Sequence, residues 1–326
     1  MSADLRILFI ASNRIGDAIL STGLLARLLT EYPGARVTVA AGPASLPVFG
    51  GVPGLENAIL LRKRRFGLHW LGLWWKTFGR SWRVVVDMRR SAIAWMLIAD
   101  RRLTPPKAER TTHRVVQAAE MLGMAGSPPA PKIWLRTPHR DAARNLIPKT
   151  GPVLALGPTA NWGGKIWPGE RFAELALRLT APDGPLPGAR IAIFGGPEER
   201  LQANPVLAAI PRDRRIDLVG KLDILTVGAC LERCQMYIGN DSGLMHLAAA
   251  IGIPTLGLFG PSDERSYGPW GCRTAFVRTP ESLDEIVNQP GYDHRSHESR
   301  MASLTVDAVH KAALDLLDQC SKGEAA

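Results

Sequence analysis

Short hydrophobic runs alternate with segments of helical periodicity through the first half of the chain. Residues 7–11 (ILFIA) read as a buried strand, and residues 18–31 place Ile and Leu side chains at helical spacing before a Tyr-Pro-Gly stop. The same pattern predicts strands at residues 36–41, 58–61 and 84–87, and a helix at 92–98. Strands that alternate with helices form a parallel sheet, so we expect an α/β domain.

The alternation restarts after a proline-rich stretch. Residues 127–131 (SPPAP) precede a helix at about 140–146, and a new strand begins at residue 153. Further strands are predicted at residues 190–194, 215–218, 235–238 and 255–259, with helices at 172–179, 224–233 and 306–317. A chain of 326 residues is long for one doubly wound domain and sufficient for two, so we predict a second domain from residue 151.

The most informative segment is residues 239–246, with the sequence Gly-Asn-Asp-Ser-Gly-Leu-Met-His. It follows an apolar run and opens an alanine-rich segment, which predicts a strand, a tight turn and a helix. This junction places the free N–H groups of a helix N-terminus at the carboxyl edge of a sheet, where α/β proteins bind anionic ligands. Asp241, Ser242 and His246 are residue types that hold phosphate and sugar hydroxyl groups.

A second junction lies near residue 16, and together the two suggest a cleft between two domains. Gly16 permits a tight turn and close approach of a ligand. Asp17 falls at or just inside the first turn of the following helix. An aspartate there is a common helix cap, and position alone favours capping over catalysis.

Two other strand ends carry candidate ligand-binding residues. Lys165 comes before a helix with Pro168 near its start, and it either reaches a phosphate over the preceding loop or is a solvated lysine. Glu198 and Glu199 follow a strand, where a carboxylate either accepts hydrogen bonds from ribose hydroxyls or is solvated or caps a helix.

Several motifs are missing from the sequence. It has no G-x-G-x-x-G fingerprint and no Walker A loop, which counts against a dehydrogenase and a P-loop kinase, and no H-E-x-x-H motif or cysteine pair that argues for a metal. Cys230 and Cys234 lie one helical turn apart and are expected to be core thiols, as suits a reducing cytoplasm. We see no signal peptide and no apolar stretch long enough to span a bilayer.

The composition and charge of the chain indicate which kinds of binding partner it could have. Hydrophobic content of 46% and charged content of 21% are those of a soluble globular protein, while the net charge of +10 favours an acidic partner. Residues 61–83 interleave Arg and Lys with Trp, a composition suited to a membrane interface. Base stacking with phosphate contacts would look similar, and a core-packed helix with one basic face is a third interpretation.

Taken together, the motifs resemble the ADP-heptose:lipopolysaccharide heptosyltransferase family, glycosyltransferase family 9. The resemblance rests on Asn-Asp-Ser-Gly-x-x-His followed by Phe-Gly-Pro-Ser-Asp in residues 239–263, on Ile-Gly-Asp at 15–17, and on Lys-x-Trp-Pro at 165–168. It implies an α/β GT-B fold, with two Rossmann-like domains that face each other across a cleft. The implied division is an acceptor domain at residues 1–150, a sugar-nucleotide domain at 151–302, and a final helix at 303–326 that returns to the first domain.

The resemblance also implies inverting glycosyl transfer without an obligatory metal or other cofactor. The family's base matches Asp17, which would take the proton of the acceptor hydroxyl. The leaving diphosphate would be met by Lys165, the Ser242 hydroxyl and the N–H groups around Ser242, Gly243 and Leu244. Asp241 and His246 would orient the donor sugar or the loop, and Glu198 or Glu199 would hold the ribose.

The remaining implied contacts are with the nucleotide base, the donor loop and the acceptor. The backbone near Val219, Gly220 and Lys221 would flank the base, and Thr159 lies in the donor loop. Arg89 and Arg90 would bind acidic groups on the acceptor, beside Arg14 and Gly16. The implied partners are a nucleotide-sugar donor, ADP-heptose, and an anionic glycolipid acceptor, without a specific nucleic acid. The implied location is cytoplasmic, on the inner face of the cytoplasmic membrane, attached electrostatically through residues 61–83.

Two other functions are compatible with the α/β reading. One is a GT-B nucleotide-sugar epimerase, which shares the fold, although the Asn-Asp-Ser-Gly-x-x-His and Ile-Gly-Asp set argues against it. The other is a non-catalytic protein that binds nucleotides or nucleic acid. The segment 279–300 is polar and has no counterpart that we can assign to a role.

Overall fold

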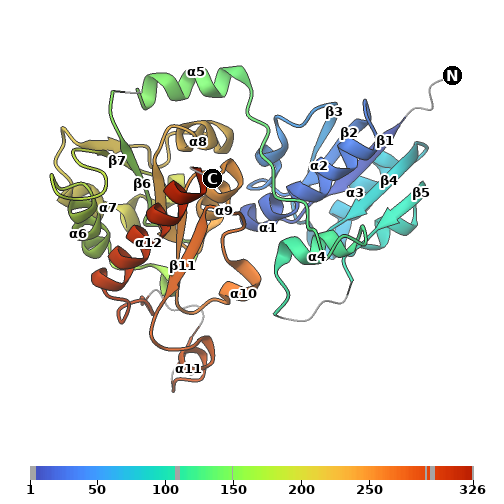
Figure 1. Cartoon of the computed structure of the whole chain (residues 1–326). Helices are drawn as coiled ribbons and strands as arrows, with labels where there is room; N and C mark the ends of the chain where they lie inside the picture. The colour runs from blue at the N-terminus through green and yellow to red at the C-terminus, as the bar shows by residue number, and fades with distance from the viewer. Residues whose placement is uncertain (1–4, 107–110, 149, 291, 294–297, 325–326) are drawn as a thin grey trace. The chain divides into compact units, whose positions relative to one another are not determined.

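Two parallel β-sheets organise the chain in a computed structural model (Figure 1). The structure describes residues 5–106, 111–148, 150–290, 292–293 and 298–324. The chain divides into two compact units, Met1–Arg136 (unit 1) and Thr137–Ala326 (unit 2). Each unit has its own sheet with helices packed on it, as the alternation of strands and helices predicts.

Unit 1 contains a five-stranded sheet in the order β3-β2-β1-β4-β5, with every pairing parallel. The side chains from Ile7 to Ile10 are fully buried at its centre, because a parallel sheet covered by helices hides both faces of a strand. The strands are β1 (Arg6–Ile10), β2 (Arg36–Ala41), β3 (Leu55–Leu60), β4 (Ser81–Asp87) and β5 (Ile98–Leu103). The helices are α1 (Ile15–Leu20), α2 (Thr22–Glu31), α3 (Leu68–Thr77) and α4 (Arg114–Glu120), with 3-10 turns η1 (Leu46–Phe49), η2 (Arg65–Gly67) and η3 (Ala92–Trp95).

Unit 2 contains a six-stranded parallel sheet in the order β11-β10-β9-β6-β7-β8. Its strands are β6 (Val153–Gly157), β7 (Arg190–Ile193), β8 (Arg215–Asp217), β9 (Met236–Asn240), β10 (Thr255–Phe259) and β11 (Thr274–Arg278). Its longer helices are α5 (Thr137–Leu146), α6 (Gly169–Leu179), α7 (Arg200–Ala209), α8 (Ile224–Leu231), α9 (Gly243–Ile251) and α12 (Val306–Glu324). Shorter turns are η4 (Gly163–Lys165), η5 (Pro197–Glu199), α10 (Glu264–Tyr267) and α11 (Leu283–Val287).

Both sheets reverse their direction of growth at their first strand. In unit 1 the chain adds β2 and β3 on one side of β1, then crosses to add β4 and β5 on the other. Unit 2 repeats this order around β6, with β9 as its neighbour across the reversal. In open α/β sheets, ligands bind beyond the carboxyl ends of the strands at such a switch point. We therefore expect ligands to bind at the loops after β1 and β4 in unit 1 and at the loops after β6 and β9 in unit 2.

The first unit ends earlier than residue 150. Helix α5, which the sequence interpretation places in the first domain, packs on α8 of unit 2. The Arg140 guanidinium binds the Glu232 carboxylate with an N–O distance of 2.9 Å, and Arg233 donates to the carbonyl of Ile147. These contacts, rather than the proline-rich stretch, decide where the compact units divide.

The last helix packs on the sheet and a helix of unit 2. Helix α12 packs against α6, β10 and β11, all in unit 2 (Figure 1). Val309, Ala313 and Leu316 recur at helical spacing and are buried in the core of unit 2. Arg178 on α6 also binds Asp307 at 2.6 Å. Because the apolar face of α12 is used here, the helix belongs to unit 2.

The segment after β4 also differs from the sequence-based expectation. Residues 92–98 were expected to be one helix, but only η3 forms there, and Ile98 opens strand β5. The β5 sequence, Ile-Ala-Asp-Arg-Arg-Leu, carries three consecutive charged residues, which the edge of a sheet tolerates. Its charged side chains hid the strand from a pattern that searches for buried hydrophobic runs.

Candidate functional site

The Gly-Asn-Asp-Ser-Gly motif forms the predicted junction between a strand and a helix. Strand β9 ends at Asn240, and Ser242 is the N-cap of α9 in extended conformation, with φ −149° and ψ 171°. Gly243 and Leu244 then form the first turn of α9, whose N–H groups have no acceptor within the helix. Ser242, Gly243 and Leu244 therefore meet as predicted at the positive end of the helix.

Lys165 and Asp241 form an ion pair from two loops of unit 2. The Lys165 Nζ lies 2.5 Å from Asp241 Oδ2, and the Asp241 side chain is only 5% exposed. The buried imidazole of His246 lies on the other side of the same carboxylate, with Nε2 3.9 Å from Oδ1. Lys165 and Asp241 come from the segments after β6 and β9, the two strands that flank the switch point, and His246 lies on helix α9.

The loop that carries Lys165 is fixed by its neighbours. Asn240 Oδ1 accepts a hydrogen bond from the Trp167 backbone N–H at 3.1 Å. The Trp167 indole is fully buried and donates to the Leu304 carbonyl at 2.9 Å. Trp167 is thus a packing residue. Asn240, which the sequence interpretation did not assign, connects the end of β9 to the lysine loop.

The polar segment 279–300, which has no role assigned from the sequence, also contacts the loop that carries Lys165. Ser299 Oγ donates to the Ile166 carbonyl at 2.6 Å, and the Arg300 backbone N–H donates to the Gly164 carbonyl at 3.0 Å. The two bonds hold the residues directly before and after Lys165, Gly164 and Ile166. Residues 294–297 of the same segment lie outside the described residues.

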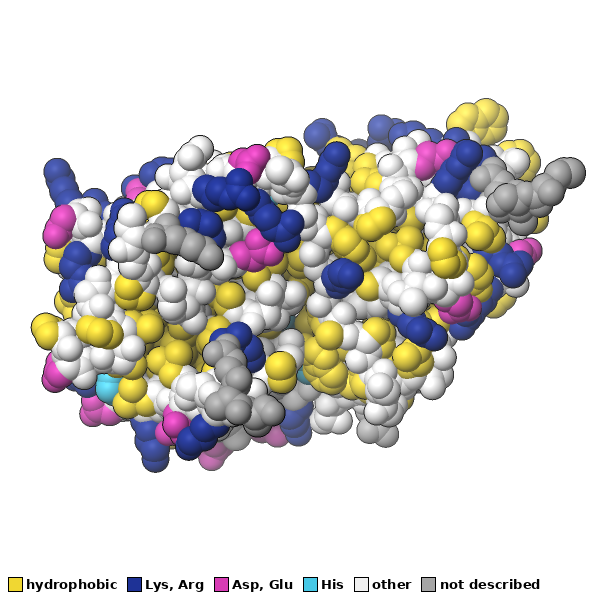
Figure 2. All heavy atoms as spheres, turned by 45° about the horizontal axis from the view of Figure 1, so that its top comes forward, with side chains coloured by type: hydrophobic (Ala, Val, Ile, Leu, Met, Phe, Trp, Pro, Cys, Tyr) yellow, Lys and Arg dark blue, Asp and Glu magenta, His cyan; other side chains and the backbone are white. Residues whose placement is uncertain are grey.

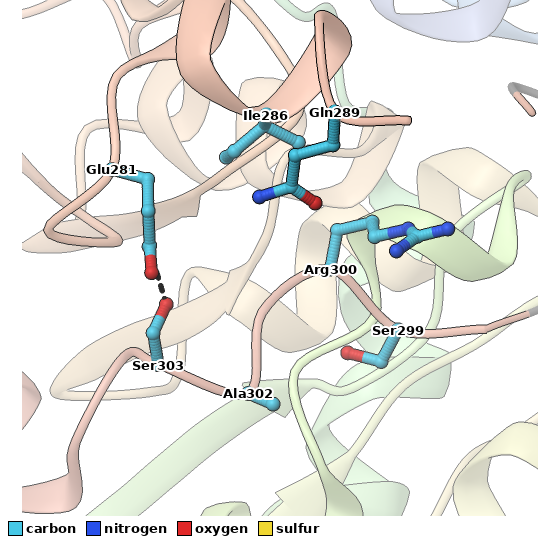
Figure 3. A pocket seen from close by; sticks show the side chains of 7 residues that line it. All are labelled: Glu281, Ile286, Gln289, Ser299, Arg300, Ala302 and Ser303. Carbon is cyan, nitrogen blue, oxygen red and sulfur yellow. Dashed lines mark hydrogen bonds between the residues drawn. The ribbon is translucent and has the colours of Figure 1, made fainter. Parts of the chain in front are cut away.

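A small pocket of about 220 Å³ opens beside these two bonds (Figure 3). On one wall, Ser303 Oγ donates to Glu281 Oε2 at 2.6 Å. The pocket is lined by none of the predicted donor-binding residues, and two of its lining residues, Ser299 and Arg300, bond to the lysine loop. The side chains that line it belong to Glu281, Ile286, Gln289, Ser299, Arg300, Ala302 and Ser303.

The structure distinguishes the two glutamates that follow β7. Glu199 Oε2 accepts a hydrogen bond from Thr159 Oγ1 at 2.6 Å and another from the Gly196 backbone N–H at 2.7 Å. Thr159 is buried in the loop after β6, so Glu199 joins the ends of β6 and β7. Glu198, in contrast, is exposed to solvent. Glu199 is therefore the better placed of the two candidates.

Lys221 lies farther along the same edge of the sheet, beyond β8. Its Nζ lies 2.8 Å from the Asp217 carbonyl and 3.2 Å from Asp217 Oδ2. A side chain at Gly195 would touch both Thr159 and Val219, so the ends of β6, β7 and β8 converge closely here. Lys221 thus borders the Thr159 and Glu199 group rather than the Lys165 pair.

A buried tyrosine beneath the motif was missed by the sequence interpretation. Gly157 and Gly239 face each other across β6 and β9, and a Cβ at either position would lie 1.9 Å or 2.3 Å from the Tyr237 hydroxyl. Burial raises the pKa of Tyr237, and the nearby Ser242 hydroxyl opposes that rise. The two glycines make room for a hydroxyl directly under the N-cap of α9. In the sequence, a glycine at the end of each of the two strands, Gly157 and Gly239, is the signal for a bulky side chain between them.

In unit 1, the Ile-Gly-Asp motif opens helix α1. Arg14 is the exposed N-cap residue, Gly16 is the second residue of the helix, and the half-buried Asp17 is the third. Asp17 is thus inside the first turn, as predicted, and it is not the N-cap residue. The motif follows β1, on one side of the switch point of this unit.

Arg89 and Arg90 follow β4, on the other side of that switch point. The fully buried Asp87 at the end of β4 accepts hydrogen bonds from the Arg89 N–H at 2.9 Å and from the Ser91 N–H and hydroxyl at 2.8 and 2.6 Å. These bonds shape a tight loop in which Arg90 adopts φ 53° and is exposed.

Arg89 turns toward helix α3. Its guanidinium carbon lies 4.5 Å from the ring centre of Trp70, a cation–π geometry. Burial lowers the pKa of Arg89, while the charge of Asp87 opposes that effect. His69 lies beside Trp70, with ring centres 4.9 Å apart, and its pKa is lowered by burial and by the charges of Arg89 and Lys63. The loop after β4 is therefore continuous with the basic-aromatic segment.

The cysteines, possible metal ligands and long helices were also compared with the expectations from the sequence. Cys230 and Cys234 are buried as expected, and burial raises the pKa of the Cys230 thiol to about 12. Among the described residues, no group of three or more His, Cys, Asp or Glu side chains is placed to hold a metal ion. No helix in the described part of the chain is long and apolar enough to cross a membrane.

Comparison with known proteins gives concordant results. The chain is 26% identical to lipopolysaccharide heptosyltransferase 2 of Salmonella typhimurium, over 97% of this chain and 99% of that protein. Lipooligosaccharide heptosyltransferase 2 of Haemophilus influenzae is 24% identical with the same coverage.

Solved structures show the same fold. A family 9 glycosyltransferase from Veillonella parvula superposes with a TM-score of 0.79 at 23% identity, over 98% of this chain and 99% of that one. The ADP-heptose lipopolysaccharide heptosyltransferase II of Escherichia coli gives 0.75 at 20% identity, over 97% and 100%. These likenesses establish the GT-B class, with two Rossmann-like domains. The family model described as "Glycosyltransferase family 9 (heptosyltransferase)" matches residues 78–290, and this chain belongs to that family of glycosyltransferases.

Proposed function

We propose that this enzyme transfers a heptose from ADP-heptose to a lipopolysaccharide core acceptor, with inversion at the anomeric carbon. The observation that carries the proposal is the Lys165–Asp241 pair beside the N-terminus of α9, at the switch point of unit 2. A cation and a helix N-terminus at one strand edge form a site for a diphosphate. The relatives named as heptosyltransferases support heptose as the transferred sugar.

The proposed donor site lies entirely within unit 2. Lys165 and the N–H groups of Ser242, Gly243 and Leu244 meet the diphosphate, while Asp241 holds Lys165 in position and His246 lies behind that carboxylate. Glu199, held by Thr159, faces the ribose, and Lys221 borders the nucleotide base. The exposed Glu198 is the weaker candidate for the ribose.

The proposed reaction balances one bond broken against one bond formed. The acceptor oxygen attacks the anomeric carbon as the bond from that carbon to the diphosphate oxygen breaks, and ADP leaves with the electron pair. Asp17 takes the acceptor proton, because a hydroxyl is a poor nucleophile until that proton departs. The charge that grows on the diphosphate is stabilised by Lys165 and the first turn of α9.

The proposed acceptor site lies in unit 1. Arg89 and Arg90 follow β4, and Arg14 and Gly16 flank Asp17 after β1, so these residues share one edge of the sheet. Guanidinium groups suit the phosphates and carboxylates of an anionic glycolipid. Because such an acceptor resides in a membrane, we also propose a cytoplasmic enzyme in peripheral contact with the inner membrane surface, through the basic residues near α3.

The test is a transfer assay with purified enzyme and a panel of nucleotide sugars. ADP-heptose with a heptose-deficient lipopolysaccharide core should give an acceptor heavier by one heptose, detected by mass spectrometry, and UDP- and GDP-sugars should not. A thermal-shift measurement should show stabilisation by ADP and ADP-heptose, since ligands that bind only the native state raise the melting temperature. Conversion of the donor to an epimer without acceptor would instead identify a nucleotide-sugar epimerase.

A further inference from the structure

We propose that the outer face of helix α3 inserts into the interface of an anionic bilayer, so that attachment has an apolar component in addition to charge. This surface, called the α3 surface below, consists of Phe66, Leu68, Leu71, Trp75 and Phe78. The inference rests on the proposed function for its biological purpose, since the acceptor proposed there is a membrane glycolipid. Its evidence comes from unit 1 alone.

Helix α3 has two apolar faces. Leu73 is buried in a core cluster of unit 1, and Trp70 and Trp74 pack against that cluster. The opposite face carries Leu68, Leu71 and Trp75, spaced three and four residues apart, and Phe78 follows directly after the helix. Each of these side chains is at least 50% exposed. A helix that only covers a core presents polar side chains to water. The exposed apolar side chains of the α3 surface would therefore be stabilised by an apolar partner outside the chain.

Phe66 adds to this surface through an unusual backbone conformation. It adopts φ 52°, which a bulky side chain rarely does, and its side chain is 95% exposed. Gly67 follows with φ 72°, so two consecutive residues are left-handed just before α3 begins. Strain of this kind persists at sites of function, and here its result is an aromatic ring held in solvent.

The charges around the α3 surface select an anionic partner. No acidic residue occurs between Glu56 and Asp87. The cationic residues of that interval are Arg62, Lys63, Arg64, Arg65, Lys76, Arg80 and Arg83. Figure 2 shows a face of the molecule on which hydrophobic and basic side chains both reach the surface.

The side-chain types favour lipid over nucleic acid. Aromatic rings among cationic groups fit the headgroup region of a bilayer, where Trp is enriched. Leu68 and Leu71 cannot stack on bases, but they can enter the acyl boundary. Turn η3 packs beside α3 and leaves Trp95 and Met96 exposed as well. An anionic bilayer satisfies all these groups together.

The experiment is co-sedimentation of the full chain with phosphatidylethanolamine vesicles, with and without phosphatidylglycerol. Binding is measured at about 0.1 M and about 1 M NaCl, because charge attraction is largely screened at the higher concentration. Wild type should bind the anionic vesicles and retain part of that binding at high salt. The variant Phe66→Ser/Trp75→Gln should lose that salt-resistant part, with partitioning reduced about tenfold or more.

Two variants control for general effects of substitution. Trp75→Phe keeps an aromatic side chain and should retain most of the binding. Leu201→Gln removes an 82% exposed leucine on α7 of unit 2 and should bind as wild type does. All replaced side chains are exposed, so melting temperatures should stay close to that of wild type.

Three results would overturn the proposal. They are complete loss of wild-type binding at high salt, undiminished binding by Phe66→Ser/Trp75→Gln, or a wild-type dimer that this variant dissociates while vesicles stay unbound. The last result would assign the surface to a second copy of the chain. Transfer to a deacylated, soluble acceptor is measured separately and should be unchanged in the variants. Vesicle binding without any transferase activity would remove the proposed function and leave the membrane surface.

Discussion

The Lys165 ammonium lies 2.5 Å from the Asp241 carboxylate, and the two side chains come from loops that flank the switch point of unit 2. The carboxylate is nearly buried, whereas the lysine is 21% exposed. The pair thus holds a cation at the edge of the sheet with part of its surface available to a ligand. An anionic diphosphate can approach that exposed side without separating the pair.

Lys165→Met should lower kcat for heptose transfer by about 10²–10³-fold, because the leaving diphosphate loses its cation. It should also destabilise the fold by leaving Asp241 buried without its partner. The loss should be smaller than the roughly 3–5 kcal/mol of a fully buried pair, since Lys165 is partly exposed. Lys165→Met/Asp241→Asn should recover stability in urea denaturation without recovering activity. Equal activity of Lys165→Met and wild type would remove the lysine from the site.

Asp17→Asn should reduce transfer by about 10²–10⁴-fold, because the amide cannot accept the acceptor proton. Donor binding should be unchanged, since Asp17 belongs to unit 1 and the proposed donor site to unit 2. Steady-state kinetics and a thermal shift with ADP provide the two measurements. Wild-type turnover by Asp17→Asn would show that another group takes the proton.

Glu199→Gln and Glu198→Gln form a matched pair of neighbouring substitutions. Glu199 binds Thr159 and the Gly196 N–H, whereas Glu198 points into solvent. Loss of a charged hydrogen-bond acceptor should weaken ADP binding about tenfold or more in Glu199→Gln, by isothermal titration calorimetry. Glu198→Gln should bind ADP as wild type does. A reversed order would exchange the roles of the two residues.

Gly157→Ala should destabilise the protein by about 1–3 kcal/mol through overpacking. The added Cβ would lie 1.9 Å from the Tyr237 hydroxyl, which has no free space to move into because Tyr237 is fully buried. Removing that oxygen should relieve part of the clash. In chemical denaturation, Gly157→Ala/Tyr237→Phe should therefore lose less stability than the sum of its single variants, and strict additivity would contradict the contact.

Asp87 should give the protein a pH-dependent stability that Asp87→Asn lacks. Burial raises the pKa of this carboxyl above its ordinary value of 3.8, although hydrogen bonds from Ser91 and Arg89 oppose the rise. The native state then binds the proton more tightly than the unfolded state does. That stabilisation is present below the unfolded pKa and is lost as pH rises through the folded pKa. The melting temperature of wild type, relative to Asp87→Asn, should fall over this interval, and a flat difference would contradict the shift.

The strongest parts of the sequence interpretation were those encoded locally. The junction at residues 239–246 could be read directly, because a buried strand, a Gly-Asn-Asp turn and an alanine-rich helix each have a local signature. The same holds for Asp17 in the first turn of α1. The burial of Cys230 and Cys234 also followed from their neighbours in sequence.

What escaped the sequence depends on partners that are distant along the chain. The choice between Glu198 and Glu199 is made by Thr159, some forty positions earlier. The division between units is decided by the packing of α5 on α8, which has no local signal. Strand β5 was hidden because an edge strand tolerates charge. The packing of α12 in the core of unit 2 has no local signal either, because an amphipathic face shows that a helix packs, but not which sheet receives it.

The common strand order of the two sheets has a consequence for how specificity can diverge. Each sheet grows outward from its own first strand, and the candidate donor residues share no strand with the candidate acceptor residues. Substitutions that reshape one set can therefore accumulate while the backbone that presents the other set stays in place. The candidate donor residues and the candidate acceptor residues can therefore change in separate evolutionary steps, and the protein can remain folded at each step.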